Sequence, residues 1–120
     1  MDFLRGENVL TLKKSNEFQN VFKKGKWFGS NLLMIYVTKN KDNINKVGIA
    51  VGRKVAKSVK RNRIRRVIRE AYRLNEDRLL KGNNIVIVWS NKASIEDASF
   101  ENIQKSLMKC LEKAELIEIN

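Results

Sequence analysis

The chain has 120 residues, of which 42% are hydrophobic and 32% charged, with a formal net charge of +12. The length suits one domain spanning residues 1–120, and the apolar content excludes a disordered basic tail. Histidine is absent, Cys110 is the only cysteine, and no apolar run reaches the ~18 residues of a membrane span, so we expect a cytoplasmic protein without an internal disulfide or a catalytic histidine.

The N-terminal half of the sequence predicts one short helix and a small set of strands. A helical pattern spans residues 15–24, and residues 32–38 form an apolar, partly β-branched run typical of a strand. Residues 46–51 predict a second strand, and the turn-rich stretch at 40–45 predicts that these two strands form a hairpin. Residues 27–29 predict a short edge strand. The helix has a narrow apolar stripe made of Phe18, Val21 and Phe22.

The C-terminal half predicts two helices with a buried strand between them. Helical periodicity covers residues 58–74, and a polar connection leads to an apolar strand at 85–89. Ser94 or Ser99 can cap a last helix. The apolar stripe of that helix consists of Phe100, Ile103, Leu107, Cys110, Leu111 and Ala114. The order of elements predicts an α+β fold, a two-layer α-β sandwich with a small mixed sheet of three to four strands.

The helix at 58–74 belongs to a strongly basic segment. Residues 53–73 contain ten Lys and Arg and one acid, Glu70, and so carry nine of the twelve net positive charges. At about 100° per residue, the basic side chains of this helix fill one arc, and like charges one turn apart in that arc repel each other. This pattern favours a polyanionic partner over a solvated face, because arginine forks bind phosphates bidentately. The apolar arc, expected to face the core, consists of Ile64, Val67, Ile68, Ala71 and Tyr72.

A motif in this helix points to a known family. Arg61-Asn62-Arg63, followed by the basic pair Arg65-Arg66 and by Arg69, resembles the signature of the protein subunit of bacterial ribonuclease P. The resemblance extends to Val-Gly-Ile-Ala-Val-Gly-Arg-Lys at 47–54 and to Phe-Gln-Asn-Val-Phe-Lys-Lys-Gly at 18–25. Motifs therefore match across about half of the chain, and the order of elements fits the family in the rest.

The resemblance implies a protein that assists a catalytic RNA. In that family the RNA, with bound Mg²⁺, removes the 5′ leader of precursor tRNA endonucleolytically, so no catalytic residue is expected in this chain. The expected partners are ribonuclease P RNA and precursor tRNA, and neither DNA nor a membrane. The resemblance also implies a left-handed β-α-β crossover around the basic helix, against the usual right-handed rule. The residues expected to bind the catalytic RNA are Lys54, Lys57, Arg61, Asn62, Arg63, Arg65, Arg66 and Arg69.

Aromatic residues suggest a second RNA-binding surface. Phe18, Phe22 and Tyr36 can line a groove floored by the small residues at 48, 50 and 52, where single-stranded bases would stack. From the sequence alone, core packing of all three is favoured. The resemblance instead favours RNA binding by these three residues, because their positions match residues that line the leader-binding cleft of the family. The leader phosphates would be bound at the rim of the groove by Lys14, Lys54 and Arg61, whereas packing roles are expected for Trp27, Trp89 and Cys110.

Three other functions compete with this interpretation. A ribosomal or other structural-RNA-binding protein is the strongest alternative, because small basic α+β proteins are common in ribosomes. A DNA-binding regulator is a second, since Asn62 on an arginine-rich helix can read adenine, but here the helix lies between predicted strands. Binding to a membrane surface would require the apolar arc that the core needs. No cluster of ligands in the sequence predicts a metal site in the protein itself.

Overall fold

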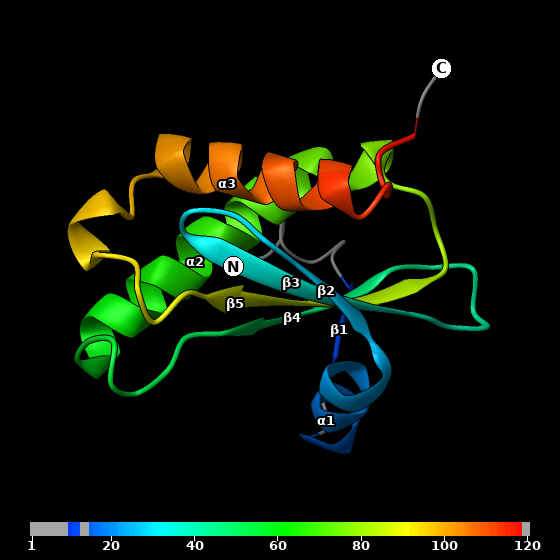
Figure 1. The fold of residues 1–120 in the computed structure, drawn as a ribbon, viewed down its shortest axis with the longest axis horizontal. Helices are drawn as coiled ribbons and strands as arrows, with labels where there is room; N and C mark the ends of the chain where they lie inside the picture. The colour runs from blue at the N-terminus through cyan, green and yellow to red at the C-terminus, as the bar shows by residue number, and fades with distance from the viewer. Residues whose placement is uncertain (1–9, 13–14, 119–120) are drawn as a thin grey trace.

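A mixed β-sheet with helices on both faces makes up the fold (Figure 1). The computed structural model describes residues 10–12 and 15–118. The strands are β1 (Leu10–Thr11), β2 (Lys26–Gly29), β3 (Leu33–Lys39), β4 (Lys46–Ala50) and β5 (Asn83–Trp89). The helices are α1 (Ser15–Lys24), α2 (Ser58–Asn75) and α3 (Phe100–Lys113), with short 3-10 helices η2 (Glu76–Arg78) and η3 (Ile95–Asp97). Within these residues no helix is long and apolar enough to cross a lipid bilayer.

The sheet has the order β1-β4-β5-β3-β2. β4 runs parallel to β5, while β3 is antiparallel to both β5 and β2, so the sheet is mixed as predicted. The predicted edge strand is β2, and the two-residue β1 adds a short parallel strand beside β4. The α+β class with a small mixed sheet is therefore confirmed. The hand of the β4–α2–β5 crossover stays a prediction.

The predicted hairpin between β3 and β4 is wrong. β5 lies between these two strands, and Ile87 is the register partner of both Ile35 and Ile49. The reason is that β5 is apolar on both faces, so the centre of the sheet is where it buries most surface. Turn residues at 40–45 carry no information about a strand that follows some forty positions later. The hairpin that does form joins β2 to β3.

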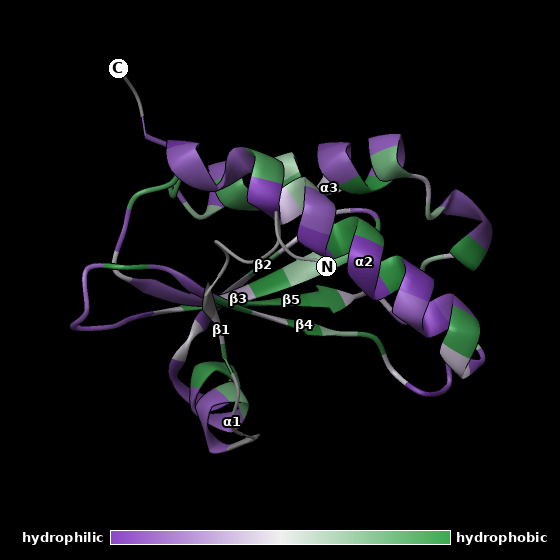
Figure 2. Cartoon of the chain, turned by 180° about the vertical axis from the view of Figure 1, so that it is seen from behind, coloured by the Kyte–Doolittle hydropathy of each residue, from purple (hydrophilic) through white to green (hydrophobic). Residues whose placement is uncertain are grey.

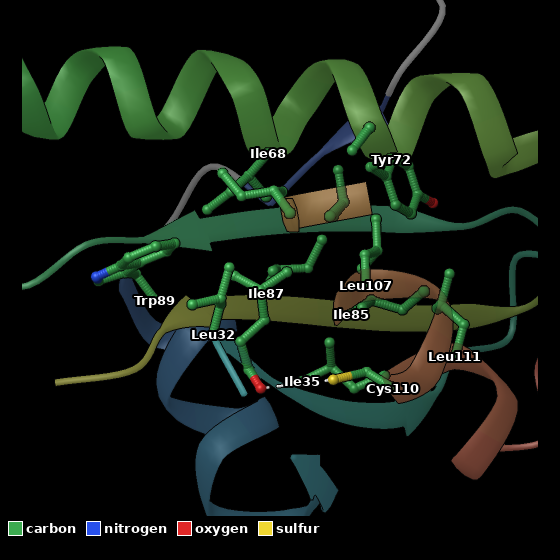
Figure 3. Packing of buried hydrophobic residues seen from close by; sticks show 14 of the residues in the cluster. Leu32, Ile35, Ile68, Tyr72, Ile85, Ile87, Trp89, Leu107, Cys110 and Leu111 are labelled. Carbon is green, nitrogen blue, oxygen red and sulfur yellow. Dashed lines mark hydrogen bonds between the residues drawn. The ribbon is translucent and has the colours of Figure 1, made fainter. Parts of the chain in front are cut away.

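The main core lies between the sheet and the pair α2 and α3. Trp89 and Ile87 of β5 pack there against the buried residues of both helices, and Figure 3 shows Ile68, Tyr72 and Leu107 among them. Cys110 is buried as predicted, and its Sγ donates a hydrogen bond to the Leu33 carbonyl at 3.5 Å. Both helices alternate hydrophilic and hydrophobic residues along their length (Figure 2). The layer of α2 and α3 thus matches the predicted sandwich.

Local capping sets the ends of the last two helical segments. The Ser94 hydroxyl accepts from the Glu96 amide at the start of η3, and the Ser99 hydroxyl accepts from the Asn102 amide at the start of α3. Each bond satisfies an amide that has no partner within its helix. Both serines named by the sequence are therefore caps, of two different segments.

A partly buried carboxylate follows the end of α2. Burial raises the pKa of Glu76 above its usual value, the charge of Asp77 raises it further, and an interaction with the Tyr72 hydroxyl opposes both effects. A negative charge at a helix C-terminus is also unfavourable, because the unpaired carbonyls there are partly negative. Ionised Glu76 therefore lowers the stability of the fold at neutral pH.

We expect Glu76→Gln to raise the melting temperature at neutral pH, because the amide keeps the shape and removes the disfavoured charge. The unfolded chain loses this proton at about pH 4.3, while the folded chain keeps it to higher pH. The stability of the wild type therefore falls as pH rises through this window, and the advantage of the variant appears there. Thermal unfolding across acid and neutral pH measures it, with Glu112→Gln on the exposed side of α3 as control. A gain that is the same at every pH would contradict this assignment.

Candidate nucleic-acid interface

α2 turns its basic side chains away from the core. Ile64, Ile68 and Tyr72 are buried, as the helical periodicity predicts. Arg61, Arg65 and Arg69 are partly buried, and the other residues of the set are exposed. We define the basic face as the set that the sequence assigned to the catalytic RNA: Lys54, Lys57, Arg61, Asn62, Arg63, Arg65, Arg66 and Arg69.

Carboxylates neutralise little of this face. Where the structure describes the chain, the ion pair on α2 joins Arg73 Nε to Glu70 Oε1 at 2.6 Å, outside the basic face. No ion pair between described residues engages Arg63, Arg66 or Arg69. Exposed Arg53 and Lys60 add two charges that the sequence analysis did not assign to the face. The face is therefore a dense array of guanidinium and ammonium groups suited to phosphates.

Arg61 has a structural role that the sequence did not reveal. Its Nη1 donates hydrogen bonds to the carbonyl of Ala56 at 2.8 Å and to that of Arg53 at 3.3 Å. The guanidinium thus ties the start of α2 to residues 53–56, the loop that carries Lys54. Arg61 positions this loop, and part of its hydrogen-bonding capacity is used within the protein.

Asn62 also acts inside the motif. Its Oδ1 accepts a hydrogen bond of 2.7 Å from Nη1 of Arg65, one turn further along the helix. The bond holds the arginine fork against the helix surface and limits the rotamers of both side chains. The spacing between the Arg-Asn-Arg motif and the basic pair therefore fixes the orientation of the Arg65 guanidinium.

The aromatic residues lie on the opposite face of the sheet, where α1 crosses it (Figure 1). The rings of Phe22 and Tyr36 are 4.8 Å apart with an interplanar angle of 81°, an edge-to-face contact. Phe18 lies directly over Gly48, because a Cβ at that glycine would come within 2.5 Å of the ring. We call the surface formed by Phe18, Phe22 and Tyr36 the aromatic face.

The aromatic face is partly exposed, which is compatible with both of its predicted roles. Beneath it, Leu12, Val21 and Val86 form a small second core, and Phe18 and Tyr36 pack at its margin. Phe22 remains 40% exposed. Each of these three rings is thus partly buried and partly exposed. Each packs against the protein and also has surface that a ligand can reach.

The floor of this face follows from strand register. Gly48, Val86 and Tyr36 form one row across β4, β5 and β3, and the next row is Ala50, Val88 and Met34. The members of the second row are all partly exposed. The aromatic face is therefore a platform whose floor is partly exposed. Lys14, expected at its rim, lies outside the described residues.

The two faces are joined by a short segment. β4 ends at Ala50 in the floor of the aromatic face, and the loop at 53–56 leads directly into α2. Lys54 and Arg61, the two residues assigned to both surfaces, stand at this junction. The fold therefore connects the two faces through one short segment.

The packing role expected for Trp27 is wrong, whereas that of Trp89 is confirmed. Trp89 is fully buried at the end of the central strand, but Trp27 is 62% exposed. Trp27 lies on the edge strand β2, directly opposite Tyr36. The physical reason is that α1 packs over β3 and β5 and leaves the edge strand β2 uncovered on this face.

A metal site does not emerge from the described side chains. No group of three or more Cys, Asp or Glu residues among them gathers closely enough to hold a metal ion. The chain also has no histidine.

Comparisons with known proteins agree with this geometry. The family model for ribonuclease P matches residues 7–115. The ribonuclease P protein component of Clostridioides difficile strain 630 is 43% identical, with 97% of this chain and 98% of the relative covered. That of Clostridium botulinum strain Loch Maree is 40% identical over 86% of this chain and 92% of the relative.

Solved structures show the same fold. The RNase P protein of Staphylococcus aureus superposes with a TM-score of 0.81 at 29% identity, covering 92% of this chain and 99% of that one. The RNase P protein of Thermotoga maritima gives a TM-score of 0.78 at 30% identity, covering 86% and 96%. The similarity therefore extends over nearly the whole chain.

Proposed function

The chain belongs to the ribonuclease P protein family, and we propose that its basic face binds ribonuclease P RNA while its aromatic face binds the 5′ leader of precursor tRNA. Members of this family are components of an endoribonuclease of bacterial tRNA processing. The observation that carries the division is that α2, with most of the basic face, and α1, with Phe18 and Phe22, lie on opposite faces of one sheet (Figure 1).

The chemistry of α2 supports binding to a structured RNA. Arginines outnumber lysines on the basic face, and their planar forks match the paired oxygens of phosphates better than an ammonium does. Releasing condensed counterions from the RNA adds a favourable term that grows with the number of phosphates contacted. The repulsion between neighbouring arginines is relieved when phosphates lie between them.

The chemistry of the aromatic face supports binding to a single strand. Each base offers a π-face, so stacking on Phe18, Phe22 and Tyr36 tolerates any sequence, as leaders of many tRNAs require. Lys54 and Arg61 at the edge would bind the backbone, and Lys14 is assigned the same role. A helical RNA would hide its bases from this surface, which favours the unpaired leader over the tRNA body.

We assign hydrolysis to the RNA subunit, whose bound Mg²⁺ would supply the metal-ion chemistry of the reaction. The residues of the protein act by binding and orienting. Stacking the leader on the aromatic face fixes the chain beyond the scissile bond, and the basic face holds the RNA in register with it. The protein thereby reduces the charge repulsion between two RNAs and raises the affinity for substrates that carry a leader.

Reconstitution tests the assignment as a whole. We expect the protein to raise the rate of 5′ maturation of precursor tRNA by a bacterial ribonuclease P RNA at low Mg²⁺, because its cations replace part of the ionic screening. The cleavage product is measured on a gel with protein alone, RNA alone and both together. Cleavage by the protein alone would overturn the proposal, and tight co-sedimentation with ribosomal subunits without any effect on cleavage would favour a ribosomal role.

The basic face makes a prediction about salt. Arg65→Ala and Arg69→Ala should each weaken assembly with the RNA and reduce the slope of log K against log salt by up to about one per lost phosphate contact. Lys105→Ala removes one charge from exposed α3 and serves as the matched control, for which the slope should stay unchanged. Wild-type affinity and slope in both arginine variants would place the RNA on another surface.

The aromatic face makes a prediction about the leader. Phe18→Ala and Tyr36→Ala should weaken binding of leader-bearing precursor tRNA by ~1 to 3 kcal/mol more than binding of mature tRNA. Gly48→Ala should act in the same direction, because the new methyl group displaces the Phe18 ring. Phe100→Ala, which removes an exposed ring from α3, controls for the loss of an aromatic surface. Equal losses for precursor and mature tRNA would assign these residues to packing alone.

A further inference from the structure

Trp27 is a large exposed aromatic side chain outside the aromatic face defined above. Its side chain is 62% exposed, against 40% for Phe22. The residue sits in β2, the outer strand of the sheet, where an exposed indole gives the fold no packing energy. An exposed edge strand is usually protected by charged side chains, and a bulky apolar side chain there is unusual. This makes Trp27 a candidate for contact with a ligand.

Strand register fixes the direction of this side chain. Trp27 is the antiparallel partner of Tyr36, and side chains of directly opposite residues lie on the same face of a sheet. The next residue, Phe28, packs against the main core on the other face. Trp27 therefore points to the side of the sheet that carries α1 and the aromatic face.

The indole also lies along the strand. Its Cζ3 is 3.6 Å from the position that a Cβ on Gly29 would occupy, so the ring covers the bare backbone of that glycine. Gly29 is in turn the partner of Met34, which belongs to the exposed row of the platform floor. The ring is thus held beside the floor and presents a broad flat surface.

Strand register places Trp27 directly beside Tyr36, at the end of one row of the sheet. The row runs from Gly48, covered by Phe18, through Val86 and Tyr36 to Trp27. Gly48 and Val86 in that row are buried, so the exposed surface within the row belongs to Tyr36 and Trp27. Neighbouring strands are about 4.8 Å apart, so Trp27 extends the stacking surface by one strand toward the edge.

We propose that Trp27 is the outermost stacking position for the leader, and that it takes a base lying farther from the cleavage site than those on Phe18, Phe22 and Tyr36. The ligand is one unpaired nucleobase of a ribonucleotide chain, of any identity. This proposal rests on the assignment of the aromatic face to the leader. It adds a position at the strand edge and predicts a longer leader footprint on the protein.

Intrinsic fluorescence tests the contact directly. The chain has two tryptophans, and Trp89 is fully buried, so Trp27 supplies the indole that a base can reach. The reconstituted protein-RNA complex is titrated with precursor tRNAs whose leaders are lengthened one nucleotide at a time. We expect quenching to begin only when the leader is long enough to reach Trp27. Mature tRNA should leave the emission unchanged, and Trp27→Phe should abolish the leader-dependent signal.

Affinity across the same leader series supplies a second readout. In the wild type we expect the affinity for precursor tRNA to increase with leader length, with a last increase at the length at which quenching begins. We call this increase the final step. Trp27→Ala should remove that step, a loss of about five-fold or more, and leave short leaders and mature tRNA unaffected. Trp27→Tyr should keep most of it. Phe100→Ala serves as the control for an exposed ring elsewhere.

The outcomes separate this inference from the function on which it rests. Quenching that does not depend on leader length, or Trp27→Ala with an unchanged final step, would overturn the role of Trp27. If Phe18→Ala and Tyr36→Ala still discriminate precursor from mature tRNA in that case, the aromatic face keeps its assignment. If they do not, the leader lies elsewhere and both proposals fail together.

Discussion

The arrangement depends on the packing of α2 against α3 and the sheet. The helix has to bury Ile64, Ile68 and Tyr72 to complete the main core, and this fixes its rotation about its own axis. Once that rotation is set, the arginines can only point outward. The energy that holds the like charges together comes from apolar burial on the other side of the same helix. A loss of core packing under α2 would therefore also disperse the basic face.

A second constraint operates on the opposite face of the sheet. α1 approaches β4 closely because position 48 has no side chain, and the ring of Phe18 occupies the space that a Cβ would fill. Val21 and Val86 hold the helix there, while the contact between Phe22 and Tyr36 sets the angle of the exposed rings. The aromatic side chains are thus fixed before any ligand arrives, which lowers the ordering cost of binding.

Local patterns in the sequence predicted what depends on neighbouring residues. The periodicity of α2 placed Ile68 inside and Arg66 outside, and the two serine caps were named in advance. The hairpin failed because strand order is decided by burial across the whole chain, which put β5 in the centre. Trp27 was misjudged because aromatic residues are usually core, although its alternation with Phe28 on β2 already placed the two on opposite faces. The bonds of Arg61 to backbone carbonyls could not be predicted, because they depend on the path of the loop.

The bonds of Arg61 give the two faces a mechanical connection. The loop at 53–56 begins just after the floor of the aromatic face and ends at the basic face, and one guanidinium holds two of its carbonyls. A ligand that binds Arg61 on the basic face would therefore also affect Lys54, which lies at the edge of the aromatic face. Under the proposed function, this connection would let the protein fold set the position of the leader relative to the RNA.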